Sequence, residues 1–593
     1  MSVLAERYVS RMDFDSYEDF YRNFQVNVPD NFNFAYDVMD ELAEDTPAER
    51  ALLWCDEKGA EAEFTYADLK RLSDKAANVL LDAGVRRGSP VMLILQRRWE
   101  YWPILLALHK IGAIAIPATH LLTAKDMVYR CTAADVEAII CVDDEKVMER
   151  VDETEARLER APHADEGCSL KLKFFVRSVH TPADTDVAGR AAEAYAGLDG
   201  EKGDAAPGSG YSPWLDFKAL LEKAPPDFIR PAQVNTNEDI MLLYFTSGTT
   251  GMPKMVQHNF AYPLGHILTA KYWQRVIPGG LHLTVAETGW AKAAWGKIYG
   301  QWLCGTGVFV YDFDRFDPAA MLKIISRYKI TTFCAPPTIY RFFIKEDMSG
   351  YDFSALKNCT VAGEPLNPEI YERFREGTGI KLRECYGQTE LTVTVCTFPW
   401  LEPKPGSMGK PSPGYDIDLL RDDGTSCGMG EEGQIVVRTD KRTPAGMFGG
   451  YYRDRELTNS VWRNNIYYTG DVAWRDEDGY LWFVGRSDDV IKSSGYRIGP
   501  FEVESALHEH PAVLECAITS IPDPDRGAVV KATVVLAKGW TASDTLKKEL
   551  QDHVKKITAP YKYPRIVEFV GELPKTISGK IRRVQIREED GVN

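Results

Sequence analysis

Residues 246–254 have the sequence Thr246-Ser247-Gly248-Thr249-Thr250-Gly251-Met252-Pro253-Lys254. Glycine, serine and threonine fill six of these nine positions, so backbone N–H groups and hydroxyls can face one ligand together. The apolar run Ile240–Phe245 comes directly before the loop and has the length of a buried strand. A donor-rich loop at the end of such a strand suits the oxygens of a polyphosphate, and Lys254 adds a positive charge. The spacing differs from that of the Walker loop, Gly-x4-Gly-Lys-Ser/Thr. A flexible surface turn is the alternative interpretation.

Apolar runs of strand length alternate with amphipathic stretches of helical periodicity from residue 64 to about residue 420. Examples of the apolar runs are Val91–Leu95, Ala138–Val142 and Thr331–Ala335. This alternation predicts a layered α/β body. Around Gly430–Tyr468 the pattern changes to short strands and glycine turns, which indicates a small β-subdomain.

The main domain boundary is predicted at Asp488, which divides the chain into residues 1–487 and 488–593. The second piece mixes strand and helix patterns and is long enough for a small α+β domain. Residues 152–213 are rich in alanine, glycine and acidic residues, and much of this piece is interpreted as an exposed insertion. The predicted fold class is therefore α/β, with a large N-terminal body and a small C-terminal domain.

The composition of the 593 residues, 44% hydrophobic and 26% charged, is that of a soluble enzyme. The net charge of −17 argues against a general nucleic-acid or anionic-membrane surface. Eleven scattered cysteines without a Cys-x2-Cys pair argue against structural zinc and disulfide scaffolds, and favour a cytoplasmic location. The N-terminus, Met1–Asp15, lacks a signal-peptide core. Tyr101–Leu122 is interrupted by charged residues and proline, and predicts a buried helix followed by a strand rather than a membrane span.

Six further motifs follow the loop along the chain. They are Gly363-Glu364-Pro365, Glu384-Cys385-Tyr386-Gly387-Gln388-Thr389-Glu390, Tyr468-Thr469-Gly470-Asp471, Gly485-Arg486-Ser487-Asp488-Asp489, Ser494-Gly495-Tyr496-Arg497-Ile498-Gly499-Pro500 and Pro574-Lys575-Thr576-Ile577-Ser578-Gly579-Lys580. In kind and order, the loop and these motifs resemble the acyl-adenylate-forming superfamily of acyl-CoA synthetases, peptide-synthetase adenylation domains and luciferases. The segments Ser493–Pro500, Pro522–Gly527 and Thr558–Arg565 are similar to the medium-chain acyl-CoA synthetases.

The resemblance implies an ATP-dependent acid–CoA ligase for short- to medium-chain carboxylic acids, branched ones included. A carboxylate would attack the α-phosphate of ATP to give an acyl-adenylate and pyrophosphate, and CoA would then displace AMP. The expected cofactors are ATP, Mg²⁺ and coenzyme A, and the expected partners are these small molecules, with a homodimer as an open alternative. An aromatic acid–CoA ligase, or an enzyme that loads a carrier protein in trans, is the alternative function. Rivals outside these are a catalytically silent nucleotide sensor and a luciferase-like oxidation.

Site residues follow from the resemblance position by position. It assigns catalysis to Lys580, Thr249, Glu390 and Arg497, the Mg²⁺ ligand to Glu390 and the hinge to Asp488. Lys580 would bridge the carboxylate and the α-phosphate, and a small domain that carries both Lys580 and Gly495 should rotate between the two half-reactions. The remaining nucleotide and CoA contacts are expected from Thr246, Ser247, Gly248, Thr250, Gly251, Lys254, Gly363, Glu364, Pro365, Glu384, Cys385, Tyr386, Gly387, Gln388, Thr389, Asp471, Arg486, Ser494, Gly495, Tyr496, Arg526, Lys555 and Arg565.

The acyl pocket is predicted around Thr288–Lys297, where the family shapes that pocket. Tryptophans at 290 and 295, with another at 273, can wall a short cavity, and core packing is the alternative role for such large aromatics. The expected pocket residues are Trp273, Trp290, Lys292, Trp295, Cys334 and Gly387. Amino-acid adenylation domains usually place an aspartate near the position of Gly289, where this chain has Glu287.

Overall fold

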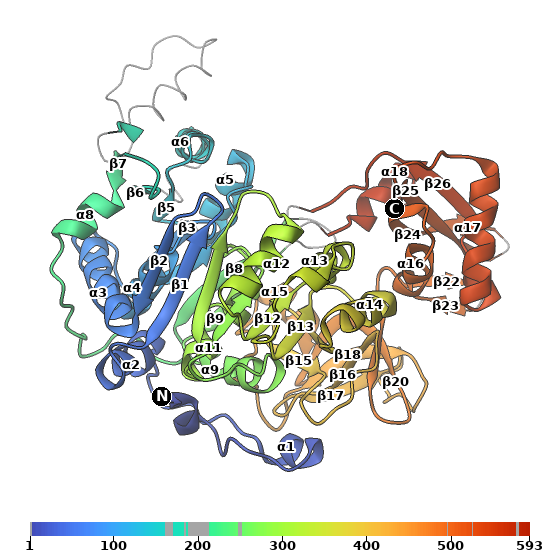
Figure 1. Cartoon of the computed structure of the whole chain (residues 1–593), viewed down its shortest axis with the longest axis horizontal. Coiled ribbons are helices and arrows are strands. Elements are labelled where there is room, and N and C mark those ends of the chain that lie inside the picture. Colours follow the sequence, from blue (N-terminus) through green and yellow to red (C-terminus); the bar gives the residue numbers. More distant parts are fainter. Residues whose placement is uncertain are drawn as a thin grey trace, which may run out of the picture.

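The computed structural model describes residues 3–160, 170–182, 185–187, 213–246, 252–494, 496–524, 526–576 and 580–592. A large body holds the N-terminal part of the chain, and a smaller C-terminal part lies beside it (Figure 1). The body is built on two sheets. The predicted α/β class, with a large N-terminal and a small C-terminal domain, is confirmed.

The first sheet is parallel except for its last pair of strands. In spatial order its strands are β7 (Trp214–Asp216), β6 (Leu172–Val176), β5 (Ala138–Val142), β3 (Pro90–Ile94), β4 (Ile114–Pro117), β8 (Ile240–Thr246) and β9 (Lys254–Asn259). The connecting helices are α3 (Tyr66–Ala83), α4 (Tyr101–Ile111), α5 (Ala124–Ala134), α6 (Glu145–Glu159) and α8 (Phe217–Lys223). Strands β3, β4 and β5 are buried along their whole length, as expected of parallel strands covered on both faces.

The second sheet changes from parallel to antiparallel along its width. In spatial order its strands are β17 (Asp416–Leu420), β18 (Gly433–Arg438), β20 (Ile466–Arg475), β21 (Leu481–Arg486), β16 (Ser407–Pro411), β15 (Val393–Cys396), β14 (Leu382–Gly387), β13 (Asn358–Ala362), β12 (Thr332–Ala335), β10 (Leu281–Thr284), β11 (Gly307–Asp312), β1 (Arg50–Asp56) and β2 (Glu61–Thr65), and β19 (Trp462–Arg463) pairs with β20. Its helices are α9 (Tyr262–Ile267), η4 (Leu268–Trp273), α10 (Lys292–Gly296), α11 (Tyr299–Leu303), α12 (Pro318–Arg327), α13 (Pro337–Phe343), η5 (Met348–Gly350), α14 (Pro368–Thr378) and α15 (Arg455–Val461).

The predicted β-subdomain is part of this second sheet rather than a sheet of its own. Strand β16 makes the connection, because it pairs with β15 on one side and with β21 on the other. Gly409 in β16 has a φ of 97°, and a Cβ atom there would lie 2.2 Å from the carbonyl carbon of Cys396. A glycine is therefore required for the close approach of β16 to β15.

The interpretation of residues 152–213 as mostly exposed insertion is wrong at two places. Residues up to Glu159 complete helix α6, and β6 is a strand of the first sheet with a largely buried pattern. The misleading signal is charge: the amino group of Lys173 in β6 is buried and contacts Asp152 at 2.7 Å and Glu155 at 2.6 Å, both on α6. Acidic residues that suggested a solvated segment thus pair with a buried lysine. The rest of this range lies partly outside the described residues.

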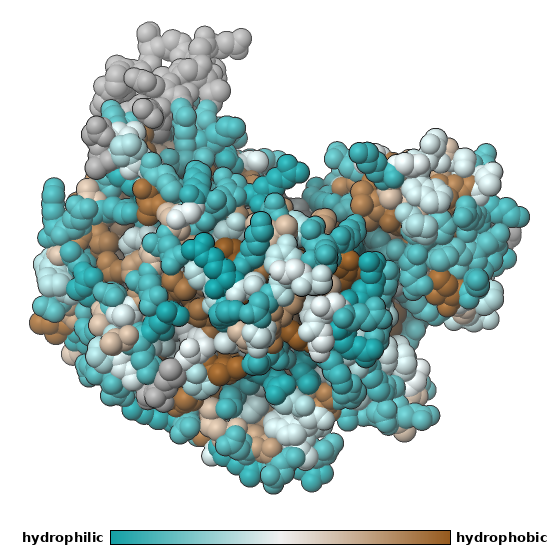
Figure 2. Space-filling model, viewed as in Figure 1, coloured by the Kyte–Doolittle hydropathy of each residue, from teal (hydrophilic) through white to brown (hydrophobic). Residues whose placement is uncertain are grey.

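The C-terminal domain has its own sheet and its own core. Strands β24 (Val513–Asp523), β25 (Gly527–Leu536) and β26 (Ile566–Val570) form the sheet, preceded by the hairpin of β22 (Ile491–Ser493) and β23 (Tyr496–Ile498). The helices are α16 (Pro500–His508), α17 (Asp544–Ile557), η6 (Pro560–Lys562) and α18 (Arg583–Glu589). The core contains Val503, Leu507, Ile518, Val530 and Leu550. Figure 2 shows this domain as a lobe that projects from the body.

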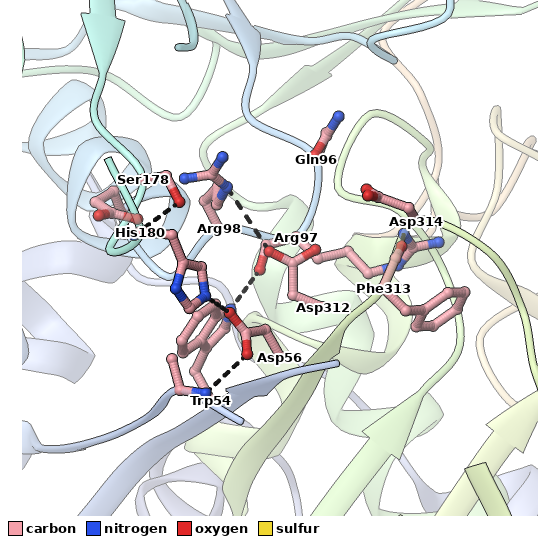
Figure 3. Close-up of polar contacts among 12 residues, drawn as sticks. Trp54, Asp56, Gln96, Arg97, Arg98, Ser178, His180, Asp312, Phe313 and Asp314 are labelled. Atoms are coloured by element: carbon pink, nitrogen blue, oxygen red, sulfur yellow. Dashed lines mark hydrogen bonds and ion pairs between the residues drawn. The ribbon is translucent and has the colours of Figure 1, made fainter. Parts of the chain in front are cut away.

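Polar contacts join the two sheets of the body near the carboxyl ends of their strands (Figure 3). The indole N–H of Trp54 in β1 donates to the carbonyl of Arg97, which follows β3. His180, which follows β6, contacts the carboxylate of Asp56 at the end of β1. Arg98 lies 3.8 Å from Asp312 at the end of β11. These contacts hold the carboxyl ends of the two sheets together.

Before the first strand run η1 (Leu4–Tyr8), α1 (Tyr17–Asn23), η2 (Ala35–Asp40) and α2 (Glu41–Asp45). This lead-in packs through aromatic rings: Phe20 lies 4.4 Å from Tyr272 and 5.0 Å from Trp400, measured between ring centroids. Across the described ranges every helix is too short or too polar to span a bilayer. The ten cysteines in these ranges are free thiols.

Candidate active site

A buried carboxylate on β20, that of Asp471, gathers the polar groups of the predicted nucleotide site. The hydroxyl of Tyr386 and the side-chain amide of Gln388 each donate a hydrogen bond to its Oδ2 at 2.6 Å. Burial raises the pKa of Asp471, and the nearby charge of Arg486 opposes that rise. A carboxylate accepts hydrogen bonds and donates none when ionised. Asp471 is therefore suited to receive the hydroxyls of a ribose.

Arg486 lies on β21 directly opposite Asp471 in the antiparallel register. Its Nη1 atom is 3.5 Å from Asp471 Oδ1. Gly470 has a φ of 76°, and a Cβ atom there would lie 3.1 Å from Arg486 Nη2. A glycine before Asp471 therefore leaves the guanidinium its place beside the carboxylate.

Two tyrosines hold the Gln388–Glu390 turn: Tyr467 lies on β20 of the second sheet, and Tyr451 bridges to Val256 on β9 of the first sheet. The hydroxyl of Tyr467 donates to Gln388 Oε1 at 2.9 Å, and the hydroxyl of Tyr451 donates to Glu390 Oε1 at 2.8 Å. His258 Nε2 donates to the carbonyl oxygen of Thr389 at 2.8 Å. Burial lowers the pKa of His258 to about 4, so this ring is neutral near pH 7.

The two strands that flank the predicted phosphate loop are antiparallel neighbours, and Thr246 at the end of β8 pairs with Lys254 at the start of β9. The candidate residues Ser247, Gly248, Thr249, Thr250 and Gly251 lie outside the described residues. The amino group of Lys254 lies 5.2 Å from the ring centroid of Tyr451, the tyrosine that contacts Glu390. Lys254, at the described end of the loop, therefore lies near the turn that carries Glu390, the candidate metal ligand.

Glu390 fits a magnesium ion that takes most of its ligands from phosphate and water. Its carboxylate is half-buried, and Tyr451 donates to Oε1, so Oε2 is the oxygen that a metal could take. The described ranges contain no group of three or more His, Cys, Asp or Glu residues that could hold a metal ion. Mg²⁺ is commonly bound through one or two carboxylates with substrate phosphates, and a single glutamate meets that requirement.

The side chains of Glu384 and Cys385 are buried in the core beside the predicted site. Glu384 is 4% exposed and accepts a hydrogen bond from the backbone N–H of Leu366 at 3.1 Å. Burial raises the pKa of Glu384 to about 8. Cys385 is buried opposite Cys396 in the β14–β15 ladder. The predicted nucleotide contacts of these two residues would have to come from their backbone atoms.

Lys292 on α10 lies at the predicted adenine wall. Its amino group donates to the carbonyl oxygen of Ala362 and lies 3.8 Å from the place where a Cβ of Gly363 would be. Burial lowers the pKa of Lys292. Gly363 has a φ of 110°, and Glu364 accepts a hydrogen bond of 3.3 Å from Thr338. Residues 363–365, the predicted adenine wall, thus directly follow β13, and Gly363 lies beside Lys292.

Trp295 and Gly387, both predicted to line the acyl pocket, pack against each other. A Cβ atom at Gly387 would lie 2.5 Å from Trp295 Cη2, so the indole edge packs directly against the glycine. Trp273 meets Trp295 edge to face at 6.4 Å and donates its indole N–H to the carbonyl of Arg383. Trp273 is thus also a core residue, the alternative role predicted for it. Cys334 is buried at β12, and Trp290 is half-buried in the turn before α10.

Lys580 reaches this site from the C-terminal domain. Its positive charge acts on the pKa of Asp471 and on the pKa of Lys292, lowering both, although burial has the larger effect on each. The side chain of Asp488, the predicted hinge, lies 3.6 Å from Arg486 Nε. The predicted catalytic lysine is therefore close enough to the predicted ribose carboxylate and to Lys292, at the predicted adenine wall, for their charges to interact.

The candidate CoA residues form a second group on the C-terminal domain. Arg526 Nη1 donates to Ser494 Oγ at 3.2 Å, and Tyr496 stacks on Tyr561 with ring centroids 4.0 Å apart. The charged ends of Lys555 and Arg565 lie 4.2 and 4.9 Å from the ring centroid of Tyr563. The candidate residue Gly495 lies outside the described residues.

Arg497, expected at the α-phosphate, lies elsewhere in this arrangement. Its guanidinium contacts Asp422, in the turn after β17, at 3.4 Å. A contact with the α-phosphate would therefore require another orientation of the C-terminal domain.

Residues 39–452 match the AMP-binding enzyme family, and residues 502–580 match the AMP-binding enzyme C-terminal domain. The chain belongs to the AMP-binding enzyme family. Among its relatives is acyl-coenzyme A synthetase ACSM3, mitochondrial, of Mus musculus, which is 40% identical over 100% of this chain and 97% of the relative. Acyl-coenzyme A synthetase ACSM4, mitochondrial, of Rattus norvegicus is 42% identical over 95% of this chain and 91% of the relative.

A solved structure of the family shows how far the fold agrees. The anthranilate CoA ligase AuaEII, in complex with anthranoyl-AMP, superposes with a TM-score of 0.79 at 27% identity, over 95% of this chain and 98% of that one. The large and small domains described above are therefore the arrangement of a CoA ligase fold.

Tyr451 and Tyr467 are site residues that the sequence analysis missed. Both belong to the stretch that was interpreted as a β-subdomain. The run Gly449-Gly450-Tyr451-Tyr452 was a usable signal, because glycines beside aromatics often mark a close backbone approach. Tyr451 makes such an approach in an antiparallel bridge with Val256 of β9.

Proposed function

We propose that this chain is an AMP-forming acyl-CoA synthetase that converts short- to medium-chain carboxylic acids into CoA thioesters through an acyl-adenylate. The observation that carries the proposal is the buried carboxylate of Asp471, which Tyr386 and Gln388 hold at 2.6 Å and which Arg486 faces at 3.5 Å, because this arrangement supplies an acceptor for the ribose of a nucleotide. The family membership and the acyl-CoA synthetase relatives support the same reaction.

In the first half-reaction the acid and the triphosphate, both anions, have to meet. Asp471 and Arg486 would hold the ribose, Tyr386 and Gln388 would keep Asp471 in place, and Lys254 would attract the phosphates. Glu390 would hold Mg²⁺, which supplies charge screening of the phosphate oxygens. Lys580 would neutralise the negative charge that develops between the attacking carboxylate and the α-phosphate.

In the second half-reaction a thiol displaces AMP, and the candidate CoA residues would have to face the adenylate. They belong to the C-terminal domain, as Lys580 does, so one fixed orientation does not serve both steps. We propose that the domain rotates at Asp488. A hinge of this kind absorbs the change in a few backbone angles at the end of an element.

Short and medium aliphatic acids are favoured because Trp295 fills the space beside Gly387. Each buried methylene contributes about 0.8 kcal/mol, which gives a graded preference, whereas a tryptophan wall sets an upper limit by steric exclusion. An aromatic acid–CoA ligase is the second candidate, and the similarity to the anthranilate CoA ligase favours it.

An amino-acid adenylation enzyme is less well supported. Glu287, the carboxylate nearest the position that would hold a substrate amine, accepts hydrogen bonds from Thr119 Oγ1 at 2.9 Å and from the backbone N–H of His120 at 3.3 Å. Glu287 Oε1 also lies 3.1 Å from Nδ1 of the His120 ring. Both carboxylate oxygens of Glu287 are thus engaged, and the residue is 7% exposed.

The experiment is a pyrophosphate-release screen with ATP and Mg²⁺ across straight-chain, branched, aromatic and amino acids, with and without CoA. We expect release with short to medium aliphatic acids and CoA-dependent formation of AMP and acyl-CoA. Highest activity on benzoate-like acids would move the assignment to the aromatic ligase. Silence across the panel would favour a nucleotide sensor.

A cytoplasmic location and a homodimer are further proposals. Free, mostly buried thiols suit a reducing compartment. The ACSM relatives are named as mitochondrial proteins, so cell fractionation with mitochondrial and cytosolic markers is the direct test. Light scattering after size-exclusion chromatography would determine the assembly.

A further inference from the structure

A cluster of four charged side chains lies at the base of the C-terminal domain. Asp489 Oδ1 is 2.6 Å from Arg587 Nη1, and Asp489 Oδ2 is 3.9 Å from Arg583 Nη1. The second terminal nitrogen of Arg583, Nη2, donates to both carboxylate oxygens of Glu504, at 2.6 and 2.8 Å. The side chains of Asp489 and Glu504 are each 10% exposed. Buried charges of this kind depend on their partners, and loss of one partner is strongly unfavourable.

Asp489 connects this cluster to the hinge and to the nucleotide site. It directly follows Asp488, and its backbone N–H donates to the carbonyl of Arg486 at 3.0 Å. Arg486 is the residue opposite Asp471. The aspartate therefore lies at the point where the C-terminal domain leaves the body.

On its other side, the cluster includes two arginines of the helix that follows the catalytic lysine in the sequence. Arg583 is the third residue after Lys580 and the first residue of α18, and Arg587 lies one turn further along that helix. Helix α18 is also held by Ile586, which packs with Ala517, Val535 and Leu573, and by its C-cap residue Asp590, which pairs with Lys531. The cluster thus fixes the rotation of the helix that directly follows the lysine loop.

The described ends of the lysine loop are held within the C-terminal domain. Its ends are closed by its own backbone: Thr576 N–H donates to the Lys580 carbonyl at 2.7 Å, and Arg582 N–H donates to the Pro574 carbonyl at 2.8 Å. Lys580 itself is exposed. Lys575 also pairs with Glu515 of β24, at 2.7 and 2.8 Å, and helix α18 follows the loop closely, so the described ends of the loop move with the C-terminal domain.

We propose that Asp489 is a positioning residue for the adenylation step. By pairing with Arg587 and Arg583 it locks the lysine-bearing end of the C-terminal domain to the hinge, so that rotation at Asp488 delivers Lys580 to one defined place. The inference rests on the proposed function and extends it: the neighbour of the hinge, and not the hinge alone, sets the position of the catalytic amine.

Loss of the pairing between Asp489 and Arg587 should affect the two half-reactions unequally. In the proposed function, adenylation needs Lys580, whereas thioester formation uses the candidate CoA residues, which include Ser494 and Arg526. A displacement of about 1 Å in a reacting group can cost about 10²-fold in rate. Asp489→Asn and Arg587→Gln are therefore expected to slow adenylation by about 10- to 100-fold, with the second half-reaction close to that of the wild type.

The test measures both half-reactions in the full-length protein, with pyrophosphate release for the first and with supplied acyl-adenylate plus CoA for the second. Asp590→Asn is the matched control, because Asp590 also pairs a buried cation near α18, Lys531, but has no contact with the hinge. Lys531 keeps Glu568 as a partner at 2.6 Å. Arg587→Lys, and the exchange of charges in Asp489→Arg with Arg587→Asp, should restore part of the adenylation rate.

A second readout does not depend on activity. Hydrogen exchange of residues 574–582 should become faster in Asp489→Asn while β24 and β25 stay protected, and Asp590→Asn should leave residues 574–582 unchanged. Selective loss of adenylation together with this local exchange supports the proposal. Equal loss in both half-reactions, an unchanged lysine loop, or the same effects in the control would overturn it. A wild-type protein that releases no pyrophosphate with any acid would instead count against the proposed function, and the exchange result would still decide the positioning claim.

Discussion

Asp471 and Arg486 face each other across two antiparallel strands, and Tyr386 and Gln388 approach the same carboxylate from a third part of the sheet. The site is thus assembled where the parallel half of the second sheet becomes antiparallel. The proposed ribose acceptor thus belongs to the sheet itself, whereas the proposed catalytic lysine belongs to the C-terminal domain.

Asp471→Asn should weaken ATP binding more than it weakens turnover at saturating ATP. Hydrogen bonds to charged groups contribute about 1.5–3 kcal/mol, so the expected rise in the KM for ATP is about 10- to 100-fold. The measurement is pyrophosphate release as a function of ATP concentration. Asp476→Asn is the control, because Asp476 lies in the turn after β20 and pairs with Lys404 away from the site. An unchanged KM in Asp471→Asn would remove the residue from the ribose contact.

Trp295→Leu should extend the range of acids toward longer chains. The indole edge lies against Gly387, so its removal would open space beside Gly387, in the predicted acyl pocket. The value of kcat/KM should then rise with added methylenes by about fourfold each, the equivalent of about 0.8 kcal/mol, until the new space is filled. Trp302 is buried and donates its indole N–H to the carbonyl of Ala51. Trp302→Leu therefore removes a similar volume and controls for lost stability. The same chain-length profile in Trp295→Leu and the wild type would show that another group limits the pocket.

Glu384→Gln should change how stability depends on pH. The pKa of Glu384 is raised from 4.5 to about 8 in the folded protein, so between these values the folded state keeps a proton that the unfolded chain releases. The stabilisation is therefore complete below pH 4.5 and is lost as the pH rises toward 8, by up to about 1.4 kcal/mol per unit. Glutamine keeps an acceptor for the Leu366 N–H but does not titrate. The Tm of the variant should gain on that of the wild type as the pH rises, and a constant difference would contradict the assignment.

The sequence was sufficient for the parts of the site that lie close together along the chain. Asp471 and Gly470 belong to one motif, and Tyr386 and Gln388 to another, and the structure joins them through Asp471. The alternation of strands and helices likewise predicted the body of the fold.

Contacts between distant segments could not be predicted in this way. Tyr451 contacts Glu390 because β9 and the segment after Gly450 pair across 195 positions, Val256 with Tyr451, and local patterns carry no record of such pairing. Arg497 was expected at the phosphates from its motif, but the orientation of the C-terminal domain places it at Asp422. Lys173 shows a third limit. The charges of this segment suggested exposure, whereas Lys173 on β6 forms buried ion pairs with acidic residues of α6.

The most direct measurement compares the wild type with Lys580→Ala in the two separate half-reactions. The wild type should form acyl-adenylate and pyrophosphate from acid and ATP, and acyl-CoA and AMP when CoA is added. Lys580→Ala should lose the first half-reaction by about 10²- to 10³-fold and still convert supplied acyl-adenylate to acyl-CoA. Formation of acyl-adenylate by Lys580→Ala at the wild-type rate would show that the lysine on the C-terminal domain does not act in the first step.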